Sequence, residues 1–318
     1  MRTNIVLIDL ENVKPKSIEK LKHEHFRVVV FVGANQKRLD FPIVNAVHSL
    51  GSNGSYVPAR MRIFAVSDLH TDFKENRLLL EQLSREEYMQ DVLLVAGDIA
   101  DRLEVIGETL ALLRSRFAGV FYTPGNHELW TRDEGCDSVE KYFRVIELCG
   151  RIGVSTSPAK EQGVWIVPLL SWYETSRGAD GDREGLEGWA DFYFCKWPDR
   201  IGSPSAYFLE MNESRIRSYD GPVVSLSHFL PRRDLLPPVE NLWFKRLPEV
   251  AICEPLEEQI RRLGSVVHVF GHSHINRDLR LDGIRYVQHA LRYPRERERQ
   301  TELVKLVWGE DAVTAARD

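Results

Sequence analysis

The chain has 318 residues, 43% of them hydrophobic and 28% charged, with a formal net charge of −5 and a pI near 6.1. This composition predicts an ordinary globular protein with one large domain and a small appendage, and it argues against a protein that coats nucleic acid. No apolar stretch approaches the roughly 18 residues of a membrane span, and the first residues do not resemble a secretory signal. We therefore expect a cytoplasmic protein without a membrane partner. The four cysteines are widely spaced without a CxxC pair, which predicts reduced thiols.

The first 60 residues are predicted to form a segment of their own. Residues 4–8 and 27–32 have the apolar runs of buried strands, and a short helix is expected between them after Pro15. A polar, glycine-containing stretch over residues 51–55 ends the segment. Such a partial, Rossmann-like βαβ unit is too small to stand alone. We expect it to pack on the main domain or to form a homo-oligomer through its exposed strand edges.

From Met61 onward, strands and helices alternate. Helical spacing and capping residues predict helices over 74–83 and 101–117, and a third helix around 139–146 with Ser138 as its N-cap and Gly150 just beyond its end. Apolar runs predict strands over 62–66, 91–96, 120–122, 164–169, 223–226, 266–270, 284–287 and 303–307. This alternation predicts a layered α/β domain. The late strands have no helices between them, which predicts that part of the sheet is antiparallel.

Side chains of the types that bind metals follow five of these apolar runs. The blocks SDLH, GD, GNHE, SH and GHSH contain Asp68, His70, Asp98, Asn126, His127, His228, His272 and His274. Polar residues at strand ends are how α/β sheets build sites on their loops. Taken singly, each block could be an ordinary turn or a core histidine. Taken in this order, each after an apolar strand, they predict a metal centre.

Asp98 is the residue on which the predicted chemistry depends. Gly97 allows a tight turn at the strand end, and the Asp98 carboxylate can offer one oxygen to each of two cations. Two such ions about 3.5–4 Å apart would hold a hydroxide between them and clamp a phosphoryl group for in-line attack. The sequence therefore predicts a hydrolase with a dinuclear centre.

The other blocks complete two mixed nitrogen and oxygen sites. Residues two apart on an extended strand end point to one side, so Asp68 and His70 can ligate one ion together, and the HSH of the last block repeats this geometry. Asn126 offers a carbonyl oxygen and His228 an imidazole. Such sites suit Mn, Fe or Zn better than Ca or Mg alone. Mn is the expected ion, with Fe and Zn as alternatives.

In this order and at these spacings, the motifs DxH, GD, GNHE, H and GHxH resemble those of the calcineurin-like metallophosphoesterase superfamily over residues 61–318. The resemblance implies a pair of mixed sheets flanked by helices, and hydrolysis of phosphate mono- or diesters by a metal-bridging hydroxide. It implies that His127 is the catalytic histidine beside the leaving group. It also implies two ligand sets that share one residue: Asp68, His70, Asp98 and His274 for one ion, and Asp98, Asn126, His228 and His272 for the other.

The block GDIADR resembles the GDxxDR block of the phosphomonoesterase branch of this superfamily. The resemblance implies that Asp101 orients His127 and that Arg102 binds phosphate, which suits a carboxylate and a guanidinium. Both residues equally suit the first turn of the following helix as an ordinary acid and a solvated base. The opening SDLH departs from the GDxH of that branch, and GHSH is more similar to bacterial phosphodiesterases. Monoester or diester specificity therefore stays open.

An aromatic-rich insertion around residues 170–245 is predicted to cap the centre. Its rings could stack on a ring of the substrate, or they could fill a small subsidiary core. Residues 178–188 are predicted to be a mobile loop. Arg232 and Arg233 follow His228 closely and could reach an anionic substrate or be solvated. The aromatic residues of this insertion are Trp172, Tyr173, Trp189, Phe192, Tyr193, Phe194, Trp197 and Trp243.

The first segment has a resemblance of its own. NIVLIDLENV followed by RVVVFVGANQ resembles the opening of PIN-like, NYN-type nuclease domains over about residues 3–57, with Asp9 and Glu11 as the matching acids. The further carboxylates that such domains need do not follow. Asp9, Glu11 and Asn12 are therefore predicted to be turn and helix-capping residues of a truncated, non-catalytic segment.

Three functions are compared on these grounds. The leading prediction is a two-metal phosphohydrolase acting on a phosphorylated small molecule, a nucleotide or a phosphodiester. The alternative is a nuclease or nucleic-acid phosphatase that uses the same dinuclear centre. A metal-poor scaffold on this fold is disfavoured because every ligand position is filled.

Overall fold

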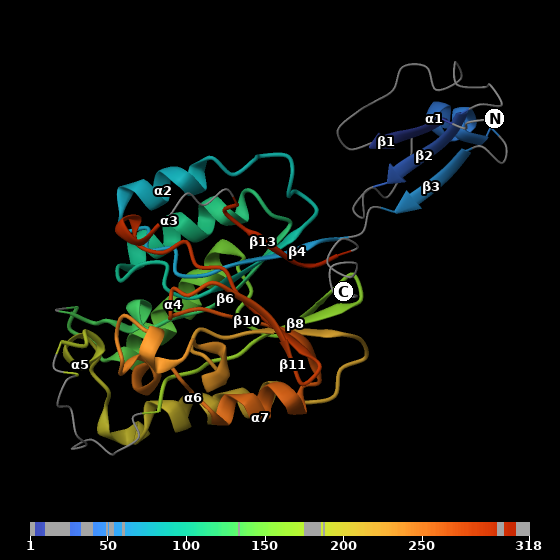
Figure 1. Cartoon of the computed structure of the whole chain (residues 1–318). Coiled ribbons are helices and arrows are strands. Elements are labelled where there is room, and N and C mark those ends of the chain that lie inside the picture. Colours follow the sequence, from blue (N-terminus) through green and yellow to red (C-terminus); the bar gives the residue numbers. More distant parts are fainter. Residues whose placement is uncertain are drawn as a thin grey trace. The chain divides into compact units, whose positions relative to one another are not determined.

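The computed structural model describes residues 4–9, 26–32, 41–48, 50, 54–58, 61–132, 134–174, 186, 188–297 and 302–309. The chain divides into two compact units, Met1–Arg62 with Gly309–Asp318, and Ile63–Trp308. Figure 1 colours both along the sequence.

The first unit contains a three-stranded parallel sheet in the order β1-β2-β3, made of β1 (Asn4–Asp9), β2 (Phe26–Val32) and β3 (Gly54–Pro58). Helix α1 spans Phe41–His48. The two predicted strands are confirmed. Strand β3 was not predicted; it begins at Gly54, within the polar stretch expected to end the segment, and pairs Tyr56 with Val30. The helix predicted after Pro15, with Glu11 and Asn12, lies outside the described residues, as does the side chain of Asp9.

A four-stranded sheet forms the first half of the second unit. Its order is β13-β4-β5-β6, with β4 (Ile63–Val66), β5 (Val92–Ala96) and β6 (Gly119–Thr123) parallel and β13 (Lys305–Trp308) antiparallel to β4. Three helices cover one face of it: α2 (Lys74–Glu81), α3 (Leu103–Arg114) and α4 (Ser138–Ile152). Alternate strand residues such as Leu93 and Val95 pack with Leu110 in the core between sheet and helices.

The second half of this unit is a six-stranded sheet in the order β11-β12-β10-β9-β8-β7. Its four inner strands are parallel, and β11 and β7 run antiparallel at the two edges. The strands are β7 (Ala159–Glu161), β8 (Val164–Pro168), β9 (Val223–Leu226), β10 (Ser265–Phe270), β11 (Arg277–Leu281) and β12 (Ile284–Gln288). The antiparallel β11–β12 pair confirms the prediction of a mixed sheet.

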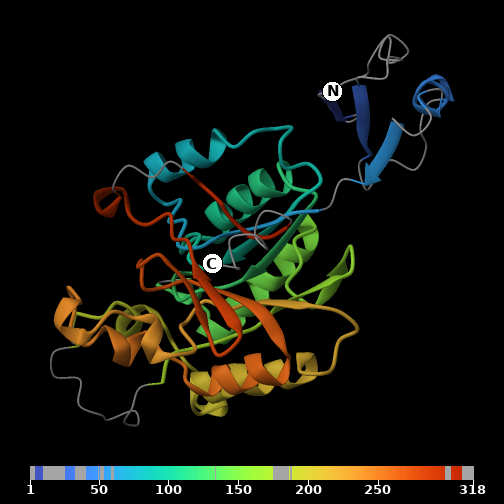
Figure 2. The ribbon, with the colours of Figure 1, turned by 45° about the vertical axis from the view of Figure 1, so that its right-hand side comes forward.

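Helices α6 (Pro204–Asn212) and α7 (Pro255–Arg262) lie beside the six-stranded sheet in both views (Figures 1 and 2), and α7 contacts β10. Shorter helical turns connect the rest: η3 (His127–Leu129), α5 (Asp191–Phe194), η4 (Asp199–Ile201), η5 (Glu213–Arg215), η6 (Arg233–Leu235), η7 (Val239–Asn241), η8 (Leu247–Val250) and η9 (Pro294–Glu296). The two sheets face each other, since β5 contacts β9 and β10 and β6 contacts β8. The predicted pair of mixed sheets flanked by helices is confirmed.

The ends of α4 differ from the predicted ones by one and three residues. The N-cap is Asp137, whose side chain accepts from the backbone of Glu140 in a reciprocal capping box, so Ser138 is already the first helical residue. Gly150 stays inside the helix. The helix ends at Gly153, which takes φ 78°, a conformation that costs glycine little.

Most of the aromatic-rich insertion belongs to the main core of the six-stranded sheet. Trp172 and Tyr173 are buried there with Phe229, and Trp197 packs against the same cluster. Trp243 is an exception, because 79% of it is exposed. Most of the predicted mobile loop, residues 178–185 and 187, lies outside the described residues.

Two further predictions concern the whole chain. Among the described residues, no helix has the length and apolarity needed to cross a membrane. All four cysteines are free thiols.

Candidate metal centre

The loops after five parallel strands bring the predicted ligands together. The backbone N–H of Asp68, after β4, donates to the carbonyl of Gly97, after β5, at 3.0 Å. The N–H of His70 likewise donates to the carbonyl of Asp98 at 2.9 Å. The N–H of His272, after β10, donates to Asp68 Oδ1 at 2.8 Å. Segments far apart in sequence are therefore fixed to one another at the centre.

The backbone is strained at the predicted ligands. Five of them have left-handed φ values, namely Asp68 (51°), His70 (42°), Asp98 (56°), His272 (71°) and His274 (56°). Each such non-glycine residue costs about 1–3 kcal/mol, and such residues collect at functional sites. The surrounding structure holds these side chains in place against that cost.

Two glycines allow the close packing of the centre. A Cβ on Gly125 would collide with Asp98 Oδ1, and one on Gly97 would collide with the His228 ring. Gly97 also has φ 78°. Both positions therefore require glycine.

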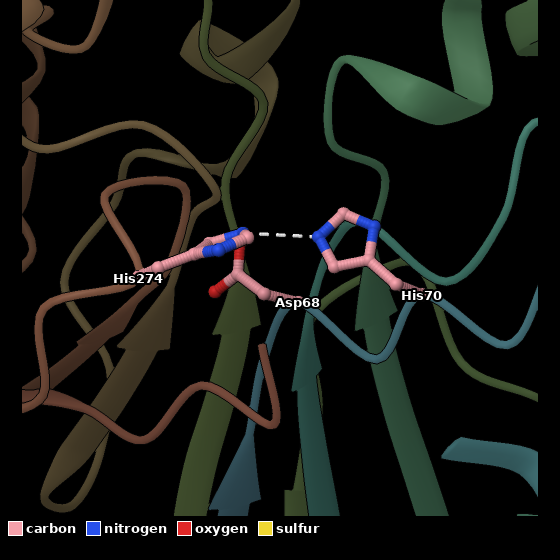
Figure 3. A group of neighbouring side chains, drawn as sticks. All are labelled: Asp68, His70 and His274. Atoms are coloured by element: carbon pink, nitrogen blue, oxygen red, sulfur yellow. Dashed lines mark hydrogen bonds and ion pairs between the residues drawn. The ribbon is translucent and has the colours of Figure 1, made fainter. Parts of the chain in front are cut away.

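The first group of converging side chains is Asp68, His70 and His274 (Figure 3). His70 Nε2 lies 3.0 Å from His274 Nε2, which in turn lies 3.5 Å from Asp68 Oδ1. His274 Nδ1 faces Glu296 Oε2 at 2.7 Å, so the ring donates its proton there and presents a lone pair at Nε2. These three residues have the donor atoms and the spacing to hold a divalent cation.

The second group is Asp98, Asn126, His228 and His272. His228 Nε2 lies 3.0 Å from Asn126 Oδ1, 3.2 Å from His272 Nδ1 and 3.4 Å from Asp98 Oδ1. Asn126 Oδ1 also lies 3.0 Å from His272 Nδ1. All four residues are buried. The structure thus brings all seven predicted metal ligands into two adjoining groups.

The donor chemistry of the second group fits a cation. His228 Nδ1 faces the Ala96 carbonyl at 2.8 Å, which assigns the ring proton to Nδ1 and leaves a lone pair on Nε2. That lone pair faces the Asn126 carbonyl oxygen, which cannot donate. The carboxylates of Asp98 and Asp68 outweigh the effect of burial on the His228 ring. The surroundings therefore favour positive charge at this point.

The Asp98 carboxylate is kept ionised. Burial alone would raise its pKa, but the His228 and His127 rings outweigh burial and hold the pKa of Asp98 well below its usual range. Its backbone N–H donates to Glu128 Oε2 at 3.1 Å. An ionised carboxylate between the two groups is what a residue shared by two cations requires.

Glu128 was given no role from the sequence, although it ends the GNHE block. It is fully buried and accepts from the backbone of Ile99 at 2.6 Å and of Gly125 at 2.7 Å, in addition to Asp98. Burial and the neighbouring Asp98 raise the pKa of Glu128 to about 7. Glu128 thereby ties the loop after β5 to the loop after β6.

Asp191 was also missed. It is 2% exposed and begins α5 in the aromatic-rich insertion. Its Oδ1 accepts from Asn126 Nδ2 at 2.8 Å and from Trp130 Nε1 at 2.6 Å, and its Oδ2 accepts from Trp189 Nε1 at 2.9 Å. The only sequence signal was an acidic residue within an aromatic run, which is also common on surfaces.

His127 lies beside Asp98 at the edge of the centre. Its N–H donates to Asp98 Oδ1 at 3.1 Å, and its Nε2 lies 3.9 Å from Asp98 Oδ2 and 3.3 Å from the Tyr293 hydroxyl. The ring packs on Trp130 with centroids 3.7 Å apart. Burial lowers the pKa of the His127 imidazole.

The structure does not bring Asp101 and Arg102 into the arrangement implied by the phosphomonoesterase resemblance. Asp101 Oδ2 accepts from Arg132 Nε at 2.5 Å, and Arg132 is held over the Phe194 ring at 4.3 Å. Arg102 is exposed at the N-cap of α3. An exposed cation at a helix start keeps its hydration, and an ion pair engages the acid. The roles that the resemblance implies for Asp101 and Arg102 stay predictions.

Arg232 and Arg233 are likewise placed outside the centre. Arg232 is paired with Asp234 at 2.7 Å, with Asp282 at 2.7 Å and with Glu257 at 3.2 Å. Arg233 begins η6. Three carboxylates neutralise Arg232, so a substrate anion would have to compete with them.

A cavity of about 780 Å³ opens onto Asp98, Asn126, His127, His272 and His274. Its lining includes the apolar side chains of Trp189, Phe244, Leu247 and Ile275. Arg292 and Arg295 line it as well. Nε of Arg292 is buried and has no hydrogen-bond partner among the described residues. The cavity therefore combines a centre suited to cations, an arginine whose Nε has no partner among the described residues, and apolar lining residues.

These features define a metal-dependent phosphoesterase, and the chain belongs to the calcineurin-like phosphoesterase family, whose model matches residues 61–276. Members of this family typically bind two metal ions, with which the two groups of buried ligands are consistent. The matched region begins at Met61, and the PIN-like interpretation of the first segment stays a prediction.

Two comparisons with individual proteins agree on one relative. The [acyl-carrier-protein] phosphodiesterase PptH of Mycobacterium tuberculosis is 30% identical in an alignment of 275 residues, which covers 79% of this chain and 83% of that protein. The crystal structure of phosphopantetheinyl hydrolase (PptH) from Mycobacterium tuberculosis superposes with a TM-score of 0.66 at 27% identity, covering 80% of this chain and 98% of that one.

Proposed function

We propose that this chain is a phosphodiesterase that removes the phosphopantetheine arm from an acyl carrier protein. The observation that carries the proposal is the pair of buried ligand groups that open into one cavity beside Arg292. The substrate class rests on PptH, whose name describes a phosphodiesterase of acyl carrier protein and which this chain matches over most of its length. In this hydrolysis, water would attack the phosphorus and the bond between phosphorus and the carrier-protein oxygen would break. The products would be phosphopantetheine and a carrier protein with a free hydroxyl group.

The ligands divide between two ions as the family resemblance implies. Asp68, His70, Asp98 and His274 would hold one, and Asp98, Asn126, His228 and His272 the other. Two divalent cations there would neutralise the phosphoryl oxygens and lower the pKa of water to near neutrality. Mn is the ion we expect, because mixed imidazole and carboxylate ligands suit it.

His127 is proposed to handle the proton of the leaving ester oxygen. Its ring lies at the cavity edge beside Asp98 and is fixed by packing on Trp130 and by the Tyr293 hydroxyl. A ring held in this way loses little further freedom when a substrate binds. Orientation by Tyr293 and Trp130 replaces the orientation by Asp101 that the resemblance implied.

Arg292 is proposed to bind a phosphoryl oxygen. Its backbone N–H donates to the Asp68 carbonyl at 3.0 Å, and its carbonyl accepts from Asn76 Nδ2 at 2.8 Å. These bonds hold the residue at φ 70° beside the centre. A guanidinium whose buried Nε has no partner among the described residues suits a phosphate anion.

The shape of the cavity favours a diester over a monoester. Its volume of about 780 Å³ lies within the usual range for ligand sites and exceeds what a phosphate group needs. Its lining includes both apolar residues and arginines, so there is room and contact surface for organic groups on the phosphate. The cavity thus supports a diester with two substituents of different character.

The test is an assay of the full chain with Mn on acyl carrier protein that carries its phosphopantetheine arm, with mass spectrometry to detect loss of the arm. We expect the arm to be released with Mn and retained with EDTA or with Asp98→Asn. Bis(p-nitrophenyl) phosphate, in the same buffer, reports the reaction class alone. Turnover of the aryl diester without release of the arm would refute the substrate and leave the reaction class standing.

A parallel incubation with labelled single-stranded RNA and DNA addresses the alternative function. We expect no cleavage and no loss of terminal phosphate under conditions that support aryl diester turnover. Cleavage faster than release of the phosphopantetheine arm would favour a nuclease.

A further inference from the structure

We propose that Asp191 is a positioning residue that selects the metal-binding orientation of Asn126 and joins it to the aromatic wall of the cavity. The proposal deepens the proposed function and rests on it for the role of the metals. Asp191 is buried, and its carboxylate spans three side chains: Asn126, Trp130 and Trp189.

The need for Asp191 follows from the chemistry of an amide ligand. A carboxamide has a carbonyl oxygen that can bind a cation and an NH₂ group that cannot. Asn126 Oδ1 lies 3.0 Å from both His228 Nε2 and His272 Nδ1. If the amide turned over, its NH₂ group would donate to these two ring nitrogens and satisfy both of them. The turned amide would then block the second ligand group.

Asp191 opposes that turned orientation. A carboxylate only accepts hydrogen bonds, so it requires the NH₂ group of Asn126 on its side and directs the carbonyl oxygen into the centre. The bond is charge-assisted and buried, which makes it stronger than a bond between neutral groups. Asp191 therefore keeps the ligand group ready for a cation before any cation arrives.

The same carboxylate fixes two rings of the cavity. Trp130 supports the His127 ring at 3.7 Å, and Trp189 stacks on Phe244 with centroids 5.8 Å apart and planes 8° from parallel. Trp189 also meets His272 edge-on at 5.9 Å. Asp191 thus links the ligand Asn126, the ring that supports His127, and the aromatic pair of Trp189 and Phe244. We infer that the wall of Trp189 and Phe244 takes an apolar or planar ester group of the substrate.

The first test measures Mn affinity on the metal-stripped full chain by isothermal titration calorimetry. Asp191→Asn keeps the shape of the side chain but removes its charge and replaces one of its two acceptor oxygens with an NH₂ group, which faces an N–H donor in either orientation. We expect Mn to bind at least about tenfold more weakly, the usual loss when a partner of a metal ligand is removed. Asp199→Asn, an exposed acid in the same segment, is the matched control and should change nothing.

A second pair of variants, made in a chain that carries Asn126→Asp, separates the orienting effect of Asp191 on the Asn126 amide from its general support of the fold. Asn126→Asp supplies oxygen atoms on both sides and needs no orienting partner. We expect Asp191→Asn to leave Mn affinity unchanged or improved in that background. An equal loss in both backgrounds, or no loss in the native one, would overturn the proposal. In the double variant, an amide again lies opposite a carboxylate, with the two positions exchanged. The double variant can therefore still be measured if Asp191→Asn alone folds poorly.

Trp189→Phe tests the wall. It keeps an aromatic ring and removes one donor to Asp191, so we expect unchanged Mn affinity. We expect KM for bis(p-nitrophenyl) phosphate to rise several-fold and KM for methyl p-nitrophenyl phosphate to change less. Equal changes for both esters would refute the assignment of the wall. These metal-binding results stand even if the carrier-protein assay fails, so the two failures are distinguishable.

Discussion

Nε2 of His70 lies 3.0 Å from Nε2 of His274, although 204 positions separate the two residues. Glu296 accepts the proton of His274 Nδ1, so the nitrogen that faces His70 is a lone-pair donor. Two ring nitrogens at this distance need a cation or a proton between them. The following predictions depend on a cation there.

His70→Ala is expected to remove one ion and leave the other. This change removes no ligand atom from the second group, which consists of Asp98, Asn126, His228 and His272. After Mn loading, the Mn content measured by elemental analysis should fall from two ions per chain to one. Phe73→Ala, an exposed position nearby, is the control. Two ions retained at native affinity would contradict the assignment of His70.

His127→Ala and Asp98→Ala are expected to fail for different reasons. Loss of a proton-handling side chain typically lowers kcat by about 10²–10⁴-fold, and the proposed ligand sets do not include His127. Loss of Asp98 removes the shared ligand, so both activity and metal content should fall. Turnover of bis(p-nitrophenyl) phosphate and elemental analysis measure the two effects. Undiminished turnover in both variants would refute the site.

Arg292→Ala is expected to lower kcat/KM for the aryl diester by about 10²-fold, because a charged donor would be lost from the phosphoryl group. Arg102→Ala should stay within about twofold of the native chain, since Arg102 is exposed at the start of α3. Steady-state kinetics on the two variants compare Arg292, which lines the cavity, with Arg102, which the GDIADR motif implied. The opposite ranking would restore the role first implied for Arg102.

Some of this centre was predictable from the sequence because its signals are local. Asp68, His70 and Asp98 each follow a buried strand, and the carboxyl ends of parallel strands meet at one sheet edge. The partners of these residues were not predictable. Asp191 begins the short helix α5 and Arg292 lies after β12, and their positions beside the centre depend on packing between segments that share no spacing rule.

The elements that were missed have physical reasons too. Strand β11 has the sequence RDLRL and is mostly exposed at a sheet edge, so it lacks the apolar run of a buried strand. The end of α4 was placed at Gly150 because glycine often follows a helix. Gly150 stays helical here, and Gly153 is the residue that adopts the left-handed conformation.

His268 should make stability depend on pH. It is fully buried between Ser225 and Ser227, and burial lowers its pKa from 6.5 to about 3. The unfolded chain takes up a proton on His268 near pH 6.5 and the folded chain does not. The contribution of neutral His268 to the free energy of unfolding is therefore complete above pH 6.5 and is lost as pH falls toward about 3. The slope is about 1.4 kcal/mol per pH unit.

Urea unfolding at pH 7 and pH 5 measures this effect. Between those pH values the free energy of unfolding of the native chain should fall by about 2 kcal/mol more than that of His268→Gln. The variant is the control, because every other titrating group is unchanged in it. Parallel pH curves for the two chains would contradict the prediction.

A truncated chain that begins at Met61 is expected to keep Mn-dependent turnover of the aryl diester. All predicted ligands lie within the second unit, Ile63–Trp308. If the first segment forms a homo-oligomer, light scattering should show a smaller assembly after truncation. Loss of turnover in a folded, truncated chain would show that residues 1–60 contribute to catalysis.

The left-handed backbone at five predicted ligands has a consequence for protein engineering. Glycine at the positions of Asp68, Asp98 or His272 would relieve a cost of about 1–3 kcal/mol and remove a ligand in the same step. Stability and activity are therefore opposed at these positions. A screen of random variants for heat resistance alone, without added metal, would enrich glycine there and select inactive protein.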